Sequence, residues 1–344
     1  MKICIIPDIH GSHEWEKAKE IQADYYVFLG DIIDAWNNKW PDQGENIAAF
    51  AAWVREDPEH RIWLLGNHDH SYLSQSRNGG NCSGHQNGKA GEIRSLLLAN
   101  KDLIKLAWEC DGWVFSHAGF TNHAIGYMKK VMHNLFEVHP KAEKSHFDSQ
   151  EEYKAYMDEL YKDFKEWDES EYSIDLLNKT FAERMAEYPE NTHKWLAFDE
   201  KLDWDGCFSG SGDEVSQFCL WVRPHSLLED AAYPKQVVGH TEYCFWNKPE
   251  VLTKGENTVV LMDSRDHHIM MFDTQDVPKS RTELDFNRAI KQLDKQICNL
   301  KSVFGMLTMG DDTLSDEEKH AKVLEEFPEN GEFIWKSFFK SEEW

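Results

Sequence analysis

The 344-residue chain has few positive charges, and this shortage narrows the range of partners. Its 37 Lys and Arg residues stand against 62 Asp and Glu residues, which gives a formal net charge of −25. A field of that sign repels phosphate backbones and anionic membranes. We therefore expect no membrane partner and no large nucleic acid. A phosphorylated substrate would need local positive charge, which divalent cations can supply.

The chain also lacks the features of secreted and membrane-spanning proteins. Its seven cysteines are odd in number and form no CxxC pair, a pattern typical of reduced thiols. No apolar run approaches the ~20 residues that a membrane span requires. The apolar stretch before Pro7 is too short for a signal peptide. These absences predict a cytoplasmic protein.

Five stretches have the same build, an apolar run of strand-forming residues followed at once by residues that bind metals. They are Ile3–His10 (ICIIPDIH), Tyr25–Asp34 (YYVFLGDIID), Ile62–Asp69 (IWLLGNHD), Trp113–Gly119 (WVFSHAG) and Gln236–Thr241 (QVVGHT). Buried parallel strands open into a crevice at their carboxyl ends. We therefore expect six side chains to converge at one sheet edge, namely Asp8, His10, Asp31, Asn67, His117 and His240.

The order of apolar runs predicts an α/β domain over residues 1–278. Up to about residue 125, strands alternate with expected helices at 14–23, 46–55 and 90–109, which favours parallel βαβ units. A helical insertion is expected over about 124–206. Closely spaced strands at 218–224, 236–241, 258–263 and 268–273 favour antiparallel pairing. A helical extension is expected over 279–344, with a capping box at Ser315 and Glu318.

The glycine-rich stretch Ser74–Gly91 follows the GNHD residues closely. A structureless loop of that length is uncommon in a compact domain and is often functional. It is either a solvated connector or a lid whose Arg77, His85 or Lys89 contacts substrate. Cys82 and His85 have no partner pair with zinc-site spacing, which argues against a zinc site there.

The residue types at the five strand ends indicate phosphate ester hydrolysis. Asp8 and His10 can grip one cation, and carboxylate with imidazole suits manganese, with iron or zinc as alternatives. Asp31 can bridge to a second cation, which Asn67, His117 and His240 would complete. Two divalent ions ~3.5–4 Å apart hold a bridging hydroxide and drive in-line attack at phosphorus.

Three further residues complete the predicted chemistry. His68 is placed to give a proton to the leaving group, and Asp34 could hold its imidazole in the charged form. Arg223 and Asn67 are the predicted contacts to the phosphoryl oxygens, Arg223 through its planar fork. The alternative for Arg223 is a surface salt bridge.

The ordered motifs DIHG, GDIID, GNHD, SHAG and GHT resemble the calcineurin-like metallophosphoesterase superfamily. The LWVRP and VVGHT stretches are similar to its PPP branch, the serine/threonine phosphatases and dinucleoside tetraphosphate hydrolases. The resemblance implies a two-layer β-sandwich flanked by helices, with two metals at one sheet edge. Asp8, His10 and Asp31 would bind the first, and Asp31, Asn67, His117 and His240 the second. Asp34 and His68 would form the proton donor.

The chain departs from the pattern of the PPP branch at two positions. Ala35 stands where the PPP branch usually has a phosphate-gripping arginine, for which Lys39 or Arg77 could substitute. Asp69 stands where that branch has glutamate. Glu242 replaces the second histidine of the GHxH motif found in phosphodiesterases of the superfamily, which favours the PPP branch.

The leading hypothesis is a dinuclear-metal phosphomonoesterase that acts on phosphoserine or phosphothreonine in proteins, or on small phosphorylated molecules. The alternative is a nucleotide phosphodiesterase or dinucleoside polyphosphate hydrolase. A metal-free scaffold that binds partners through 333–339 (FIWKSFF) is a third reading. Retention of all six ligand types argues against it.

Overall fold

The computed structural model describes residues 1–35, 40–74, 82–132, 147–169, 172–187, 219–242, 249–263, 267–277 and 315–326, with single positions at 189, 215 and 217. The chain divides into two compact units, Met1–Ser280 and Arg281–Trp344. In the second unit the structure describes α12 (Asp316–Glu326). The predicted capping box is present there: the Ser315 N–H donates to Glu318 Oε2 (2.8 Å), and the Glu318 N–H donates to Ser315 Oγ (3.3 Å).

The first sheet has the strand order β10-β1-β2-β3-β4. β1, β2 and β3 run parallel as predicted, and β4, which the sequence did not predict, runs parallel to β3. Its strands are β1 (Lys2–Ile6), β2 (Tyr25–Phe28), β3 (Arg61–Leu64), β4 (Ile104–Lys105) and β10 (Met270–Asp273). β10 pairs antiparallel with β1, with Ile5 opposite Met270. The residues just before Met270 therefore lie at the same edge as those that follow β1.

The second sheet has the order β5-β6-β7-β9-β8. Its strands are β5 (Ala107–Cys110), β6 (Trp113–Ser116), β7 (Lys235–Val238), β8 (Glu250–Lys254) and β9 (Asn257–Leu261). Of the second-half strands for which antiparallel pairing was predicted, β10 pairs antiparallel with β1, but the prediction is wrong for β7, which runs parallel to both β6 and β9. β5 and β8, which the sequence did not predict as strands, pair antiparallel with β6 and β9. The long segment between β6 and β7 provides the crossover that a parallel pair needs.

The two sheets pack face to face and form the predicted two-layer sandwich. Alternate residues of β1 and β2, such as Ile3, Ile5 and Val27, are buried in one apolar cluster with Phe115 and Val260 of the second sheet. The residues between them face the other way, because successive strand side chains point to opposite faces. Both faces of the first sheet are thus buried, as its unbroken apolar runs predict.

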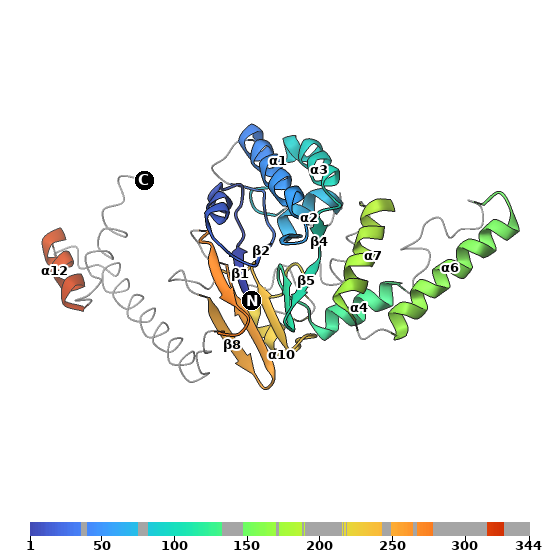
Figure 1. Cartoon of the computed structure of the whole chain (residues 1–344). Coiled ribbons are helices and arrows are strands. Elements are labelled where there is room, and N and C mark those ends of the chain that lie inside the picture. The colour runs from blue at the N-terminus through green and yellow to red at the C-terminus, as the bar shows by residue number, and fades with distance from the viewer. Residues whose placement is uncertain are drawn as a thin grey trace. The chain divides into compact units, whose positions relative to one another are not determined.

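Helices cover the outer faces of the sandwich (Figure 1). On the first sheet these are α1 (Trp40–Glu56), α2 (Asn67–Ser74) and α3 (Ala90–Ala99). The 3-10 helix η1 (Glu14–Glu20) lies between β1 and β2 in the chain, and η2 (Asn87–Lys89) directly precedes α3. Phe50 of α1 packs edge-on against Phe28 and Trp63 at ring distances of 4.9 and 5.2 Å. On the second sheet α10 (Pro224–Glu229) buries Leu227.

The insertion expected over about 124–206 is mostly helical in its described residues, as predicted. It contains α4 (Asn122–Met132), α6 (Gln150–Glu169) and α7 (Ile174–Glu187). Asn178 of α7 connects it to the sandwich, because its side chain donates to the Ala107 carbonyl at 2.8 Å and accepts from the Leu106 N–H at 3.0 Å.

Two predicted elements were wrong. The helix expected over 90–109 ends at Ala99, because Ile104 pairs with Trp63 of β3 and extends the first sheet. The strand expected over 218–224 is absent from its described residues, where Cys219 and Leu220 lie in a turn and Pro224 begins α10. Proline fits the first position of a helix, where its missing N–H has no partner to lose.

None of the described helices combines the length and the apolar character that crossing a bilayer requires. The four cysteines in the described residues, Cys4, Cys82, Cys110 and Cys219, are all buried and none forms a disulfide.

Candidate metal centre

The five predicted strand ends meet at one edge of the sandwich. Asp8 and His10 follow β1, Asp31 and Asp34 follow β2, and Asn67 begins α2 just after β3. His117 follows β6 and His240 follows β7 in the second sheet. The site is therefore built from the carboxyl ends of parallel strands in both sheets, whereas the sequence predicted that the six side chains lie at the edge of one sheet.

The backbone is strained at this edge. His10, Asp31, Asp34 and His240 have positive φ angles of 44°, 58°, 69° and 60°, a conformation that residues other than glycine rarely adopt. Such strain persists only where the surrounding structure imposes it, and it is concentrated at functional sites. The loops turn sharply here and direct these side chains toward one another.

Hydrogen bonds to groups outside the site determine which atoms of Asn67 and His117 face it. His117 Nδ1–H donates to the Leu29 carbonyl at 2.8 Å, so Nε2 carries the lone pair of the neutral ring. The Asn67 amide donates through Nδ2 to Cys82 Sγ at 3.5 Å, which turns Oδ1 toward the histidines. The residue Cys82, which the sequence did not connect with Asn67, thus orients a predicted ligand.

The resulting cluster of lone pairs fits a cation. His117 Nε2 lies 2.7 Å from Asn67 Oδ1, although both atoms are acceptors, and 3.6 Å from Asp31 Oδ2. Burial lowers the pKa of His117, so no proton is available to join the two acceptors. His240 Nδ1 lies 3.1 Å from the same Asn67 oxygen. These four side chains are the predicted second ligand set.

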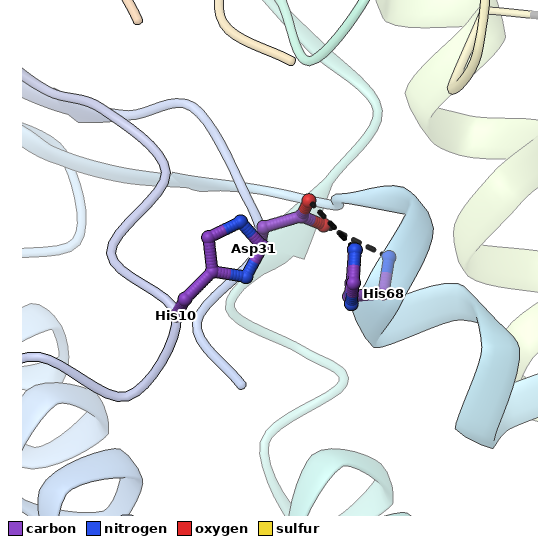
Figure 2. Close-up of side chains that lie close together, drawn as sticks. All are labelled: His10, Asp31 and His68. Atoms are coloured by element: carbon purple, nitrogen blue, oxygen red, sulfur yellow. Dashed lines mark hydrogen bonds and ion pairs between the residues drawn. The ribbon is translucent and has the colours of Figure 1, made fainter. Parts of the chain in front are cut away.

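The first predicted set is assembled differently. His10, Asp31 and His68 offer ligand atoms within 4.8 Å of one another (Figure 2). The same is true of Asp31, His117 and His240. Within the described residues Asp8 belongs to neither group. Its carboxylate accepts the His240 N–H at 3.1 Å and lies 3.8 Å from His117 Nδ1. Asp8 is therefore in the site but is turned toward the second group.

Burial and neighbouring charges shift the pKa values of the ionisable groups around the site. Burial, Asp263 and Asp31 raise the pKa of Asp8 well above its usual range. Burial would raise the pKa of Asp31 too, but the neighbouring His117 and His68 lower it to about 2. Burial also lowers the pKa of His10 and His240, which keeps both rings neutral and able to coordinate. Carboxylates beside neutral imidazoles fit divalent cations.

His68 differs from the other histidines. Its Nδ1 is 2.8 Å from Asp34 Oδ2, and its Nε2 is 3.9 Å from Asp31 Oδ2. Burial lowers its pKa, but the charges of Asp31 and Asp34 outweigh burial and raise it. Although its position would allow it to coordinate a cation with His10 and Asp31, a ring held in the charged form is better suited to donate a proton.

Asp69 braces the two loops that carry Asp31 and Asn67, a role the sequence did not indicate. It is fully buried and accepts three main-chain N–H groups, from Asp31 (3.0 Å), Ile32 (3.0 Å) and Gly66 (3.1 Å). The Asp31 carboxylate in turn accepts the His68 N–H at 2.9 Å. The two aspartates thus connect the loop after β2 to the start of α2.

His267 is a second residue that sequence reasoning missed. It has a φ of 54°, its Nδ1–H donates to the Asp8 carbonyl at 2.6 Å, and its ring centre lies 6.1 Å from that of His10. It comes shortly before β10, whose start lies beside the end of β1. A prediction that β10 pairs antiparallel with β1 would have placed His267 at this edge of the sheet.

The predicted phosphate contact Arg223 lies beside the second group. It precedes α10, donates to Thr241 Oγ1 at 3.3 Å, and its charge helps to lower the pKa of His240, after burial and His117. The predicted substitutes Lys39 and Arg77 lie outside the described residues. Of the Ser74–Gly91 loop, positions 82–91 are described, and His85 stacks on Tyr72 at 4.0 Å.

Comparison with known proteins identifies the family. A family model for calcineurin-like phosphoesterases matches residues 1–241. The chain belongs to this family. It is therefore a metal-dependent phosphoesterase, a hydrolase of phosphate esters, and the predicted resemblance is confirmed at this level. The matched region contains all six predicted ligands, and the His and Asp groups of this calcineurin-like phosphoesterase offer sites for divalent ions.

A search of curated proteins returned no significant match. The solved structures similar to this calcineurin-like phosphoesterase include a cold-active protein-tyrosine phosphatase of a psychrophilic Shewanella species, 15% identical, covering 79% of this chain and 75% of that chain, with a TM-score of 0.44. A protein serine/threonine phosphatase from Saccharomyces cerevisiae is 17% identical over 35% of this chain and 38% of its own, with a TM-score of 0.26. A metallophosphoesterase from Sphaerobacter thermophilus is 18% identical over 37% and 54%, with a TM-score of 0.21. The family assignment rests on the sequence model.

Proposed function

We propose that this phosphoesterase hydrolyses phosphate monoesters, on phosphoserine or phosphothreonine of proteins or on small phosphorylated molecules, with His68 as the general acid. The observation that carries this proposal is the juxtaposition of the lone-pair cluster around Asn67 Oδ1 with the His68–Asp34 pair. One part can hold cations and the other can hold a proton. Metal ions and a proton donor each accelerate ester hydrolysis at phosphorus, the first by activating the phosphoryl group and water, the second by protonating the leaving oxygen.

His10, Asp31 and Asp8 would hold one divalent ion, and Asp31, Asn67, His117 and His240 the other. When bound, such ions supply Lewis-acid activation of the phosphoryl group and of the attacking water. We propose manganese, with iron or zinc as alternatives, because mixed carboxylate and imidazole donors suit all three. We also propose a cytoplasmic location, on the cysteine pattern of the sequence.

The chain's own residues would orient the ester and protonate its leaving oxygen. Arg223 is half-buried beside His240 and can donate to phosphoryl oxygens through its fork. Asn67 would keep its amide oxygen directed into the site while Cys82 accepts its Nδ2–H. His68 holds its Nδ1–H on Asp34, so that the proton on Nε2 is the one given to the leaving group. Glu242, which stands at the diesterase histidine position, is exposed, which supports the monoester preference.

A substrate panel tests the proposal. The rates of the manganese-loaded protein would be compared on 4-nitrophenyl phosphate, bis(4-nitrophenyl) phosphate, a phosphoserine peptide and a dinucleoside tetraphosphate. The proposal expects the highest kcat/KM on a monoester and loss of the activity on chelation. Activity confined to the bis ester would instead establish the phosphodiesterase alternative, and preference for the tetraphosphate the pyrophosphohydrolase alternative.

A matched pair of variants separates chemistry from metal binding. His68→Asn should keep metal and lose turnover, whereas His117→Asn should lose metal and turnover together. Elemental analysis of both purified proteins measures the difference. A His68→Asn protein that retains full activity on a poor leaving group contradicts the assignment of the acid.

A further inference from the structure

The hydroxyl group of Tyr72 connects a neighbouring loop to the Asp34–His68 pair. Tyr72 lies on α2, one turn beyond His68, and only 2% of it is exposed. Its Oη lies 2.5 Å from Asp34 Oδ1, and the main-chain N–H of Gln86 donates to the same oxygen at 2.7 Å. Because that N–H can only donate, the phenol accepts from Gln86 and directs its own hydrogen to Asp34.

Asp34 is thereby held at both oxygens. Tyr72 donates to Oδ1 and His68 Nδ1 to Oδ2, and the carboxylate is fully buried. A carboxylate anchored through one oxygen can still rotate about its last bond, whereas two anchors determine its plane. That plane determines the orientation of the His68 ring, and therefore where Nε2 points.

Further contacts hold Tyr72 in place. The His85 ring stacks on it with a centre distance of 4.0 Å and an angle of 16° between the planes. His85 Nδ1 also lies 3.2 Å from Ser71 Oγ, which donates to the His68 carbonyl at 2.7 Å. The segment from Cys82 to Gln86 thus contacts Ser71 and Tyr72 of α2 through a stacked ring, a side-chain hydrogen bond and a main-chain N–H.

We propose that Tyr72 is a positioning residue for proton donation: it fixes the plane of Asp34, so that His68 presents Nε2 to the leaving oxygen. This inference rests on the proposed function, since it takes His68 as the acid. Tyr72 acts through Asp34 and is not itself in contact with the reacting atoms.

The test is Tyr72→Phe, which keeps the ring and its stacking but removes the hydroxyl group. Phenyl phosphate and 4-nitrophenyl phosphate would be compared with saturating manganese, because the poorer leaving group depends more on the donated proton. We expect kcat on phenyl phosphate to fall about tenfold, a part of the ~10²–10⁴-fold that a general acid supplies. On 4-nitrophenyl phosphate kcat should fall much less, with KM and bound metal unchanged.

The matched control is Tyr26→Phe. The Tyr26 hydroxyl donates to the Ile21 carbonyl at 2.6 Å, near the start of β2, whereas Asp34 follows the end of that strand. This variant should leave the rates on both esters unchanged. A second control is the double variant Tyr72→Phe/His68→Asn, which should be no slower than His68→Asn alone.

An equal fall on both esters, loss of bound metal, or no fall on either would overturn the proposal. So would a double variant slower than His68→Asn. A readout independent of turnover is the NMR resonance of the His68 Nδ1 proton in zinc-loaded protein, which should shift in Tyr72→Phe and not in Tyr26→Phe. If the wild type hydrolyses neither ester, the proposed function fails, while an unshifted resonance overturns the positioning role by itself.

Discussion

Replacing Asp69 by alanine tests whether the buried carboxylate holds the site together. In Asp69→Ala three buried main-chain N–H donors, those of Asp31, Ile32 and Gly66, lose their acceptor. An unsatisfied buried donor costs ~1–3 kcal/mol, so the free energy of unfolding should fall by about 3–9 kcal/mol. Since domains have only ~5–15 kcal/mol of stability in total, the variant should be close to unfolding.

Urea unfolding followed by circular dichroism measures this loss. The matched control is Asp102→Ala, because Asp102 pairs with Arg55 at 2.7 Å on the surface, where both groups are exposed. That variant should shift the midpoint little. If Asp69→Ala unfolds at the same urea concentration as the control, the three hydrogen bonds do not have the stabilising role described above.

Asp69 should also make the stability of the metal-free protein depend on pH. Burial and the charge of Asp31 raise the pKa of Asp69 from 3.8 to about 7. A raised pKa in the folded state means that folding favours the protonated carboxyl group, so this contribution to stability is full below pH 3.8 and is lost as the pH rises toward 7. Asp69→Asn cannot ionise, and its unfolding midpoint should lose that part of the pH dependence.

Three further outcomes follow from the site. His68→Asn should lower kcat by ~10²–10⁴-fold with metal content unchanged by elemental analysis, and a loss of metal would instead make His68 a ligand. Asp34→Asn removes a charge that helps to raise the pKa of His68, so the alkaline limb of the kcat profile should move to lower pH, and a move to higher pH would refute the pairing. In Gly239→Ala the new Cβ would lie 2.5 Å from Asp8 Oδ1 and displace that carboxylate. The metal affinity measured by calorimetry should therefore fall by ~10–100-fold. An unchanged affinity would show that Asp8 does not contribute to metal binding.

The sequence predicted which side chains converge, because each of the six proposed ligands lies shortly after a buried strand. Asp31 and His117, for example, lie just beyond apolar runs whose pairing partners are also apolar, and parallel strands bring their ends to one edge. The same local reasoning failed for residues 218–224, where an apolar run is compatible with either strand or turn, and Pro224 decides for a helix start.

The supporting residues could not be predicted because their roles arise only from tertiary contacts. Tyr72, Cys82 and His267 contact Asp34, Asn67 and Asp8 across gaps in sequence that carry no periodic signal. Asp69 was visible only as a departure from a motif, and its three hydrogen bonds depend on how two loops meet. The sequence pattern indicates which chemistry a side chain can perform, whereas tertiary packing determines which neighbouring groups hold that side chain in place.

The crossover between β6 and β7 has a consequence for biosynthesis. His117 and His240 are neighbours in the folded protein, with ring centres 5.0 Å apart, but the whole helical insertion must be translated between them. A nascent chain that has completed β6 still lacks β7, Arg223 and the last histidine. The proposed second ion therefore cannot have its full ligand set until His240 has been translated, and β6 and β7 pair over a long sequence separation, a kind of contact that forms slowly.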